Sequence, residues 1–294
     1  MTFSMTGYGK SSCQYKGRVL TLEIRTLNSK QGDINLRIPA IYREKELEMR
    51  EIISSQLDRG KIDLSIQRDL AEGETATELN VPLVDAFYKL FKKLEADMEE
   101  EPSKSSTDYL SLIMKMPDVL KPATIDLEEE EFESLKIALD ECLLRVNEFR
   151  KQEGAKLEAV LAEGTKNIKA GLDRIIPFEE DRINRIKKRI YNNLGEDAEN
   201  ASFDKDRFEQ ELIYYLEKLD ITEEKVRLGA HCDYFLRTLA EESVKGKKLS
   251  FIAQEMGREI NTLGSKAQHS EMQRIVVEMK DELEKIKEQA LNVL

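Results

Sequence analysis

The sequence has few of the residues that build disulfide frameworks or multi-histidine metal centres. It has three cysteines, Cys13, Cys142 and Cys232, and none forms a CxxC pair, so neither a disulfide framework nor a structural zinc site is indicated. Its two histidines, His231 and His269, are too few for a multi-histidine metal centre. No apolar run approaches the ~18 residues of a membrane-spanning helix, and the N-terminus lacks the charged-then-apolar pattern of a signal peptide. We expect a soluble, cytoplasmic protein without a membrane partner.

Tryptophan is absent, and aromatics (6%), glycine (14 residues) and proline (6 residues) are scarce. Charged residues make up 35% of the 294 residues, against roughly 25% in an average globular protein. This composition is typical of long solvated helices rather than of a β-sandwich or a doubly wound nucleotide-binding fold. With 46 basic and 58 acidic residues the net charge is −12, so the overall field repels phosphate. Any contact with nucleic acid must therefore come from a local basic patch.

Alternation of apolar and polar residues predicts β-strands at the start of the chain. The pattern recurs over residues 20–25, 34–38 and 62–67, and the opening stretch 3–15 adds a fourth segment. One face of each segment is apolar and the other polar, which is typical of a largely antiparallel sheet with one solvated face. A helix over 41–58 interrupts the strands and is expected to cover the apolar face.

Almost everything after residue 126 follows a helical period. Apolar residues three or four apart form a seam along a long predicted arm: Phe132, Leu135, Leu139, Cys142, Val146, Phe149, Leu157, Val160, Gly164, Ile168 and Ile175. Pro177 is expected to bend or break this helix. An arm of this length rarely buries its own seam, so we expect a closed homo-oligomer formed through the arms at 126–195.

Helical stripes continue to the C-terminus, and the strongest has i, i+3, i+4, i+7 spacing over residues 249–267. The predicted fold class is α+β, with a mainly antiparallel four-stranded N-terminal sheet with helices, a long helical arm and a helical C-terminal domain. We divide the chain into a β-rich domain at 1–125, the arm at 126–200, and a C-terminal domain at 201–294 that carries the candidate active site.

The first candidate for chemistry is Glu153, which lies between Phe149 and Leu157 at a seam position where the pattern calls for an apolar side chain. A carboxylate there is costly unless it is paired or binds a cation. The alternative is that the seam opens near Gly154 and that Glu153 is solvated.

The second candidate is a basic segment after Pro177. Arg182, Arg185 and Arg189 lie at i, i+3 and i+7 and therefore share one helix face. Arginine binds phosphate in a two-pronged fashion, so this face is the best candidate for a local phosphate contact. The alternative is a solvated face that pairs with acidic residues of a neighbouring helix.

The third candidate is a helix face on which Glu224, Arg227 and His231 fall at i, i+3 and i+7. A carboxylate and an imidazole in this arrangement can share a metal or exchange a proton. The alternative is a purely structural histidine.

The fourth candidate is a polar stripe beside the strongest apolar one, made of Glu255, Arg258, Glu259, Thr262 and Lys266. Two glutamates at i and i+4 can jointly bind a divalent cation, and Arg and Lys can then bind phosphate oxygens. The alternative is a ladder of salt bridges on a solvated face.

Several segments resemble the bacterial YicC family over nearly the whole chain. Residues 5–9 (MTGYG) are similar to the family's MTGFG start, and residues 23–28 (EIRTLN) and 33–39 (DINLRIP) are similar to its strand pair. The most diagnostic block is 249–267, LSFIAQEMGREINTLGSKA. Residues 28–32 (NSKQG) depart from the family's more usual NHRFL.

The resemblance implies a divalent-metal-dependent endoribonuclease, using Mn²⁺ or Mg²⁺, that acts on single-stranded RNA. It also implies a homohexamer that encloses its substrate, and a β-rich N-terminal domain joined to a helical C-terminal domain. The family blocks include every residue of the metal-site candidates, which are Glu153, Glu211, Glu224, Glu255 and Glu259.

The residue patterns, which coincide with family blocks, make Glu255, Glu259, His231 and Arg258 the catalytic candidates. The RNA-binding candidates are Arg182, Arg185, Arg189, Arg227 and Lys266, with Arg25 and Arg37 on the predicted sheet. The alternative function is a non-catalytic helical scaffold or RNA-binding adaptor, in which the polar stripes are interface salt bridges.

Overall fold

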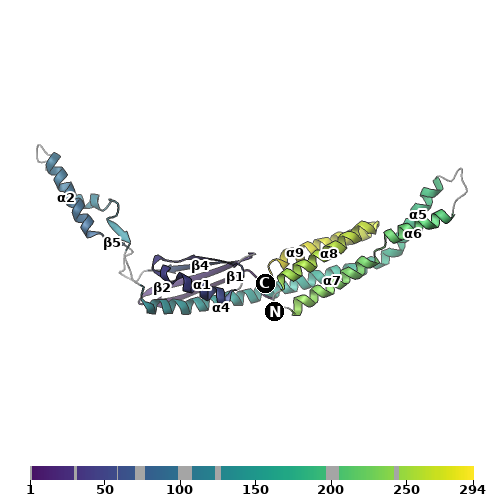
Figure 1. The fold of residues 1–294 in the computed structure, drawn as a ribbon, viewed down its shortest axis with the longest axis horizontal. Helices are drawn as coiled ribbons and strands as arrows, with labels where there is room; N and C mark the ends of the chain where they lie inside the picture. The colour runs from purple at the N-terminus through teal and green to yellow at the C-terminus, as the bar shows by residue number, and fades with distance from the viewer. Residues whose placement is uncertain are drawn as a thin grey trace.

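The computed structural model describes residues 2–29, 32–57, 59–69, 77–98, 108–122, 127–196, 205–241 and 245–294. Figure 1 shows an elongated molecule in which a sheet and a bundle of helices follow one another along a single long helix, α4 (Glu129–Ile175). The chain is α+β, as predicted, with its main sheet at the N-terminus and a helical C-terminal region. No helix in the described ranges is long and apolar enough to cross a membrane.

The N-terminal sheet has the strand order β1 (Gly7–Tyr15), β2 (Arg18–Leu27), β4 (Lys61–Arg68) and β3 (Asp33–Arg37). β2 pairs antiparallel with both β1 and β4. β3 and β4 run parallel because η1 (Ala40–Lys45) and α1 (Glu46–Gln56) form the crossover between them. The predicted four-stranded, mainly antiparallel sheet is therefore confirmed, with one parallel pair at an edge.

Two helices, α1 and the first half of α4, cover the apolar face of the sheet. Leu22 and Ile24 of β2 are fully buried in one cluster with Phe132 of α4 and with apolar side chains of α1. β1 lies directly against α4, since a Cβ atom at Gly9 would lie 2.4 Å from the backbone oxygen of Cys142. The helix expected over the apolar face is present there, and it shares the face with α4.

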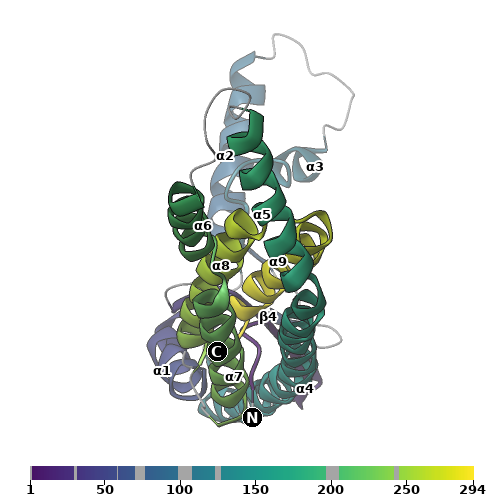
Figure 2. The same ribbon diagram turned by 90° about the vertical axis from the view of Figure 1, so that its right-hand side faces the viewer.

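The second half of α4 packs in a bundle with α7 (Thr222–Glu241), α8 (Gly246–Ala267) and α9 (Ser270–Ala290). Within the bundle, α4 packs against α7 and α9, and α8 packs against the same two helices. Figure 2, which looks toward the helical end of the molecule, shows these four helices grouped together. α4 and α8 therefore lie diagonally across the bundle.

The apolar seam of α4 has partners within its own chain. Leu139 and Val146 are buried against the sheet, and Ile168 is buried against the C-terminal helices. Of the predicted seam residues, only Phe149 and Val160 are exposed, at 41% and 51%. The prediction that the arm needs a second subunit to bury its seam is wrong, because the sheet and then the bundle cover it in turn.

The long helix ends at Pro177, as predicted. A short turn, η2 (Ile176–Phe178), contains this proline, and α5 (Glu179–Glu196) continues beyond it. α5 packs against α6 (Lys205–Lys218), and the pair extends past the end of the bundle in Figure 1.

A small separate lobe consists of β5 (Thr77–Leu79), α2 (Val81–Met98), α3 (Tyr109–Ile113) and β6 (Leu120–Pro122). β5 and β6 pair antiparallel, and the Phe91 ring of α2 stacks on Tyr109 with ring centroids 6.2 Å apart. Figure 1 shows this lobe beyond the sheet, at the opposite end of the molecule from α5 and α6.

The two ends of the chain meet where the sheet joins the bundle (Figure 1). Ser4 forms an antiparallel bridge with Val293. At this joint Arg150 of α4 is only 2% exposed, and its guanidinium donates to the Thr26 hydroxyl at 3.2 Å and to the Arg59 carbonyl at 3.2 Å. The sheet, the long helix and the C-terminal segment are therefore tied together at one place.

Candidate active site

Helix α8 turns one apolar face toward the bundle and carries a polar stripe beside it. Five residues form this α8 stripe: Glu255, Arg258, Glu259, Thr262 and Lys266. Four of them are half-buried, whereas the Arg258 side chain is 74% exposed. The stripe therefore lies at the rim between the core and solvent, where charged groups keep part of their hydration and remain accessible to a ligand.

Glu255 and Glu259 lie one helical turn apart, with Arg258 between them in sequence. Arg258 Nη1 lies 2.9 Å from Glu255 Oε1, so the two side chains form an ion pair. Arg258 Nη1 donates its hydrogen bond to the other oxygen, Glu255 Oε2, at 3.3 Å, and Oε1 is buried with no hydrogen bond from the described residues. This carboxylate oxygen is therefore available to a better-placed cation.

The α7 helix places His231 beside the α8 stripe. The two helices are antiparallel, and Glu224 of α7 pairs with Lys266 of α8 at 2.7 Å. His231 lies seven residues after Glu224, and Glu259 lies seven residues before Lys266, so the half-buried imidazole is at the level of Glu259. The structure thus brings His231 to the same level of the helix pair as the Glu255–Glu259 turn.

Glu224 and Lys266 bind each other at the far end of this helix pair. Glu224 is only 6% exposed, and the Lys266 ammonium also donates to the Asp220 carbonyl at 2.9 Å. Glu224 Oε2 is buried and has no hydrogen-bond partner among the described residues. Any contact of Lys266 with RNA would compete with this ion pair.

Arg182 does not share the exposed face predicted for the three arginines. It is 5% exposed, and its guanidinium donates to the carbonyls of Leu219 at 2.9 Å and Lys266 at 3.2 Å. Burial lowers the pKa of this guanidinium from its ordinary value. The expectation is therefore wrong for Arg182, because the turn at Pro177 directs this face onto the α6–α7 and α8–α9 connections.

Arg185 and Arg189 of α5 are exposed, as the phosphate-contact prediction requires. Arg185 pairs with Asp181 at 2.8 Å, and the same carboxylate lies 3.0 Å from His269 Nε2. The hydrogen bond from His269, with that from Arg185, lowers the pKa of Asp181. These contacts leave Arg189 as the more available cation of the two.

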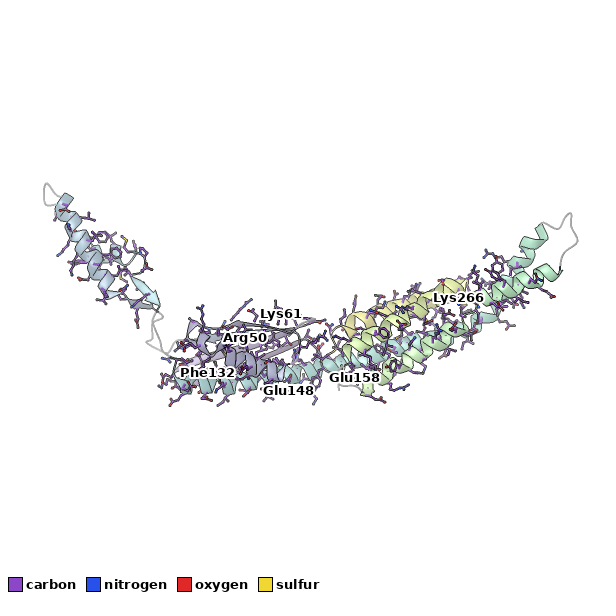
Figure 3. The ribbon with its side chains drawn as sticks, viewed as in Figure 1. Arg50, Lys61, Phe132, Glu148, Glu158 and Lys266 are labelled. Atoms are coloured by element: carbon purple, nitrogen blue, oxygen red, sulfur yellow. The ribbon has the colours of Figure 1, made fainter. Side chains whose placement is uncertain are left out.

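Glu153 and Glu211 lie away from the Glu255–Glu259 turn. Glu153 is half-buried on α4, across the bundle diagonal from α8, and binds Lys156 at 3.3 Å. Figure 3 labels Glu148 and Glu158, which bracket this part of α4, near the joint, whereas Lys266 lies toward the other end of the bundle. Glu211 is on α6 outside the bundle, and its side chain is outside the described set.

Across the described ranges, no three His, Cys, Asp or Glu side chains come together in a group that could hold a metal ion. The four predicted metal-site glutamates whose side chains are described, Glu153, Glu224, Glu255 and Glu259, are therefore not assembled into one such group. The largest subset that this chain brings together is the Glu255–Glu259 pair, with His231 at the same level on the neighbouring helix.

The remaining RNA-binding candidates lie on two other surfaces. Arg227 on α7 forms an ion pair with Glu223. Arg25 and Arg37 both line a groove of about 470 Å³ on the open face of the sheet. Arg25 binds Glu23 there at 2.7 Å, so this groove has mixed charge.

Sequence reasoning missed Phe251, an aromatic side chain on α8 that is 61% exposed. It lies one turn before Glu255, in line with the α8 stripe rather than with the apolar face. Its spacing could have identified Phe251 as an exposed ring, because an aromatic residue outside the apolar stripe does not pack into the bundle core.

Models of one protein family match both halves of the chain. Residues 3–159 match the N-terminal region of Endoribonuclease YicC-like proteins, and residues 175–294 match their C-terminal part. The chain is 30% identical to a probable endoribonuclease YicC of Clostridioides difficile and 26% identical to one of Haemophilus influenzae, each match covering 100% of both chains. The chain thus belongs to the family of YicC-like endoribonucleases.

Proposed function

We propose that this protein is a divalent-metal-dependent endoribonuclease that cleaves single-stranded RNA at the Glu255–Glu259 turn of α8. The observation that carries the proposal is the placement of two carboxylates one turn apart at the half-buried rim of α8, with His231 level with them on α7. A surface salt-bridge ladder does not require a histidine beside it. Phosphodiester cleavage uses acidic, basic and imidazole groups together.

The donor set of this turn fits Mg²⁺ or Mn²⁺. Both ions prefer oxygen ligands, and Mg²⁺ is commonly bound by one or two protein carboxylates together with substrate phosphates and water. Glu255 and Glu259 would be the protein ligands, and the under-bonded Oε1 of Glu255 favours this assignment. The ion, when bound, supplies Lewis-acid stabilisation of the charge on the phosphate group.

The chain's own residues would orient the RNA and move protons. Arg258 is mostly exposed and can exchange its contact with Glu255 for a two-pronged contact with a phosphate. His231 makes no hydrogen bond or ion pair with the other described residues, so both ring nitrogens are available for substrate. Its imidazole would accept a proton from the attacking group or donate one to the leaving oxygen.

Affinity for RNA would come from local basic patches, since the net charge of −12 opposes it. Arg185 and Arg189 on α5 are the favoured patch because they are exposed. The open sheet face with Arg25 and Arg37 is the second choice, because Glu23 and Asp63 in the same groove reduce its positive charge.

We also propose a homo-oligomer, with the hexamer of the family resemblance as its form. The buried seam of α4 gives no support for this, but the small lobe does. Val81, Leu90 and Leu94 of α2 are 63%, 50% and 45% exposed, and Leu110 of α3 is 61% exposed. A cluster of large apolar side chains on one small lobe is typical of an interaction surface.

The test of the cleavage proposal is hydrolysis of a labelled single-stranded RNA by the purified protein with Mn²⁺ or Mg²⁺, and its arrest by EDTA. Glu255→Gln and Glu259→Gln should each abolish cleavage with little change in thermal melting, because Gln keeps the volume but loses the charge. His231→Ala should abolish cleavage because it removes the group that transfers the proton. Glu284→Gln is the matched control, since Glu284 forms an ordinary exposed ion pair with Lys287 on α9. Full activity of all three variants would identify the stripe as a salt-bridge ladder, worth about 1 kcal/mol or less per pair.

A further inference from the structure

A groove of about 720 Å³ lies at the joint between the sheet and the bundle. The loop after β2, the loop before β4, the start of α8 and the C-terminal segment all contribute to it. We call it the joint groove, and the lining residues that matter here are Asn28, Arg59, Lys247, Phe251 and Gln254. Asn28 donates to the Leu291 carbonyl at 2.8 Å and so holds the β2 side of the groove to the C-terminal segment.

The joint groove is a positively charged place on an acidic protein. Arg59 and Lys247 line it, and among the described residues its lining includes no Asp or Glu. Within the described part of the chain neither the Arg59 guanidinium nor the Lys247 ammonium has an ion-pair partner. By contrast, the arginines Arg25, Arg227 and Arg258 each pair with a glutamate. Two cations without an ion-pair partner among the described residues attract an anion.

Phe251 gives the same groove an exposed aromatic face. Its side chain is 61% exposed, and Leu291 beside it is 58% exposed. The side-chain amide of Gln254 lies in the same lining and can hydrogen-bond either a donor or an acceptor. An unpaired nucleotide offers a partner for each of these groups: its phosphate for the cations, the face of its base for the exposed aromatic ring, and the edge of its base for the amide.

The groove is continuous with the candidate active site along one helix. Lys247, Phe251, Glu255 and Glu259 follow one another at intervals of four residues, so they form one stripe on α8. Each interval advances about 6 Å along the helix axis. A strand held at Phe251 therefore lies one turn from Glu255.

We propose that the joint groove binds a single-stranded segment of RNA, with a base stacked on Phe251 and phosphates bound by Lys247 and Arg59, and leads the strand to the Glu255–Glu259 turn. This inference rests on the endoribonuclease function proposed above, whose substrate path it specifies. Single-stranded RNA is favoured over an acidic peptide for two reasons. A peptide does not explain the exposed aromatic ring, and Phe251 in the groove lies one helical turn from Glu255 of the candidate cleavage site.

The test measures affinity and cleavage separately on the full-length protein. A fluorescein-labelled 12-nucleotide oligouridine is titrated in EDTA, where metal-dependent cleavage is stopped, and binding is followed by anisotropy. Phe251→Ala should weaken binding roughly ten-fold or more, and Phe251→Trp should restore it, because any aromatic face can stack a base. Phe149→Ala is the matched control, since Phe149 is an exposed phenylalanine on α4 outside the groove.

Salt dependence tests the two cations. The double substitution of Arg59→Gln with Lys247→Gln should reduce the slope of log affinity against log salt by about 1.4, as expected for two lost phosphate contacts on a single strand. Lys280→Gln on the exposed side of α9 should leave the slope unchanged.

The outcomes separate the two proposals. Suppose that the wild-type protein binds and cuts RNA, and that Phe251→Ala and the double variant bind RNA equally well. This result would overturn the proposal that the joint groove binds RNA, but not the proposed nuclease function. Loss of affinity in these variants, with no metal-dependent cleavage by wild type, would support the groove and overturn the proposed catalysis. An acidic peptide that binds in place of the oligouridine would overturn the choice of ligand.

Discussion

The Lys266 ammonium of α8 lies 2.7 Å from Glu224 Oε1 of α7, and the other oxygen of this carboxylate is buried without a hydrogen bond from the described residues. This ion pair joins the two helices that flank the candidate active site. Since the Glu224 side chain is only 8% exposed, its charge depends on Lys266 for compensation.

Replacement of Lys266 by Met should therefore destabilise the protein by about 2–4 kcal/mol, near the lower end expected for a broken buried pair because Lys266 is itself partly exposed. Urea unfolding measures this loss. Glu224→Gln added to Lys266→Met should recover part of it, since no buried charge then remains. Lys280→Met, on exposed α9 surface, is the control and should stay within about 0.5 kcal/mol of wild type.

The arginines after Pro177 should separate into one structural residue and one binding pair. Arg182→Gln should lower the melting temperature, because the two backbone carbonyls that it binds would lose their donor. Arg185→Gln with Arg189→Gln should leave melting unchanged but weaken RNA binding and flatten its salt dependence. Unchanged affinity and salt slope in the double variant would direct attention to the sheet face with Arg25 and Arg37.

A buried carboxylate under the sheet should make stability fall in acid. Glu131 is fully buried and accepts hydrogen bonds from Tyr42 at 2.5 Å, Arg18 at 2.9 Å and Arg68 at 3.0 Å. Burial raises the pKa of Glu131, but these hydrogen bonds and the two positive charges outweigh burial, so the pKa lies below its ordinary value of 4.5.

Because the folded-state pKa is the lower one, the stabilisation is complete above about pH 4.5 and is lost as the pH falls through the folded-state pKa. Glu131→Gln should be less stable than wild type at pH 7 and should lose less stability between pH 5 and pH 3. Chemical unfolding across this range measures both effects. Parallel curves for the two proteins would contradict the assignment.

Self-association should depend on the small lobe. Light scattering at micromolar concentration should give an oligomeric mass for wild type, and Leu90→Asn with Leu94→Asn should reduce it, because these exposed leucines would be buried between copies. Leu47→Asn is the control, since Leu47 of α1 is 75% exposed on a different surface. A monomeric mass for wild type would refute the oligomer.

The sheet could be predicted from the sequence because the period of two in residues such as Leu20, Leu22 and Ile24 is a local property. The parallel pairing of β3 with β4 was missed, although a helix between the two strands permits it. The surface that covers the α4 seam could not be predicted, because it depends on contacts between residues far apart in the sequence. An apolar stripe has the same pattern whether a second subunit or the same chain buries it.

In the candidate site, too, local relations could be predicted from the sequence and long-range ones could not. Spacing correctly placed Glu255, Glu259 and Arg258 together on one stripe, because helix geometry alone fixes that relation. Spacing also put Arg182 on one face with Arg185, but the environment of that face depends on the direction of α5 after Pro177. The surroundings of Glu153 are long-range in the same way: the N-terminal segment crosses α4 at Gly154, where a Cβ atom would lie 2.1 Å from the Thr2 carbonyl oxygen.

Helix α4 gives Phe132, Leu139 and Val146 to the hydrophobic cluster of the sheet and Leu161 and Ile168 to that of the bundle. Its α-helical hydrogen bonding continues without interruption between the two sets. Helix formation is cooperative, so the part of α4 ordered by one core lowers the cost of ordering the part that enters the other. The two hydrophobic cores are therefore thermodynamically coupled through a shared backbone, and a substitution that loosens one of them weakens the other as well.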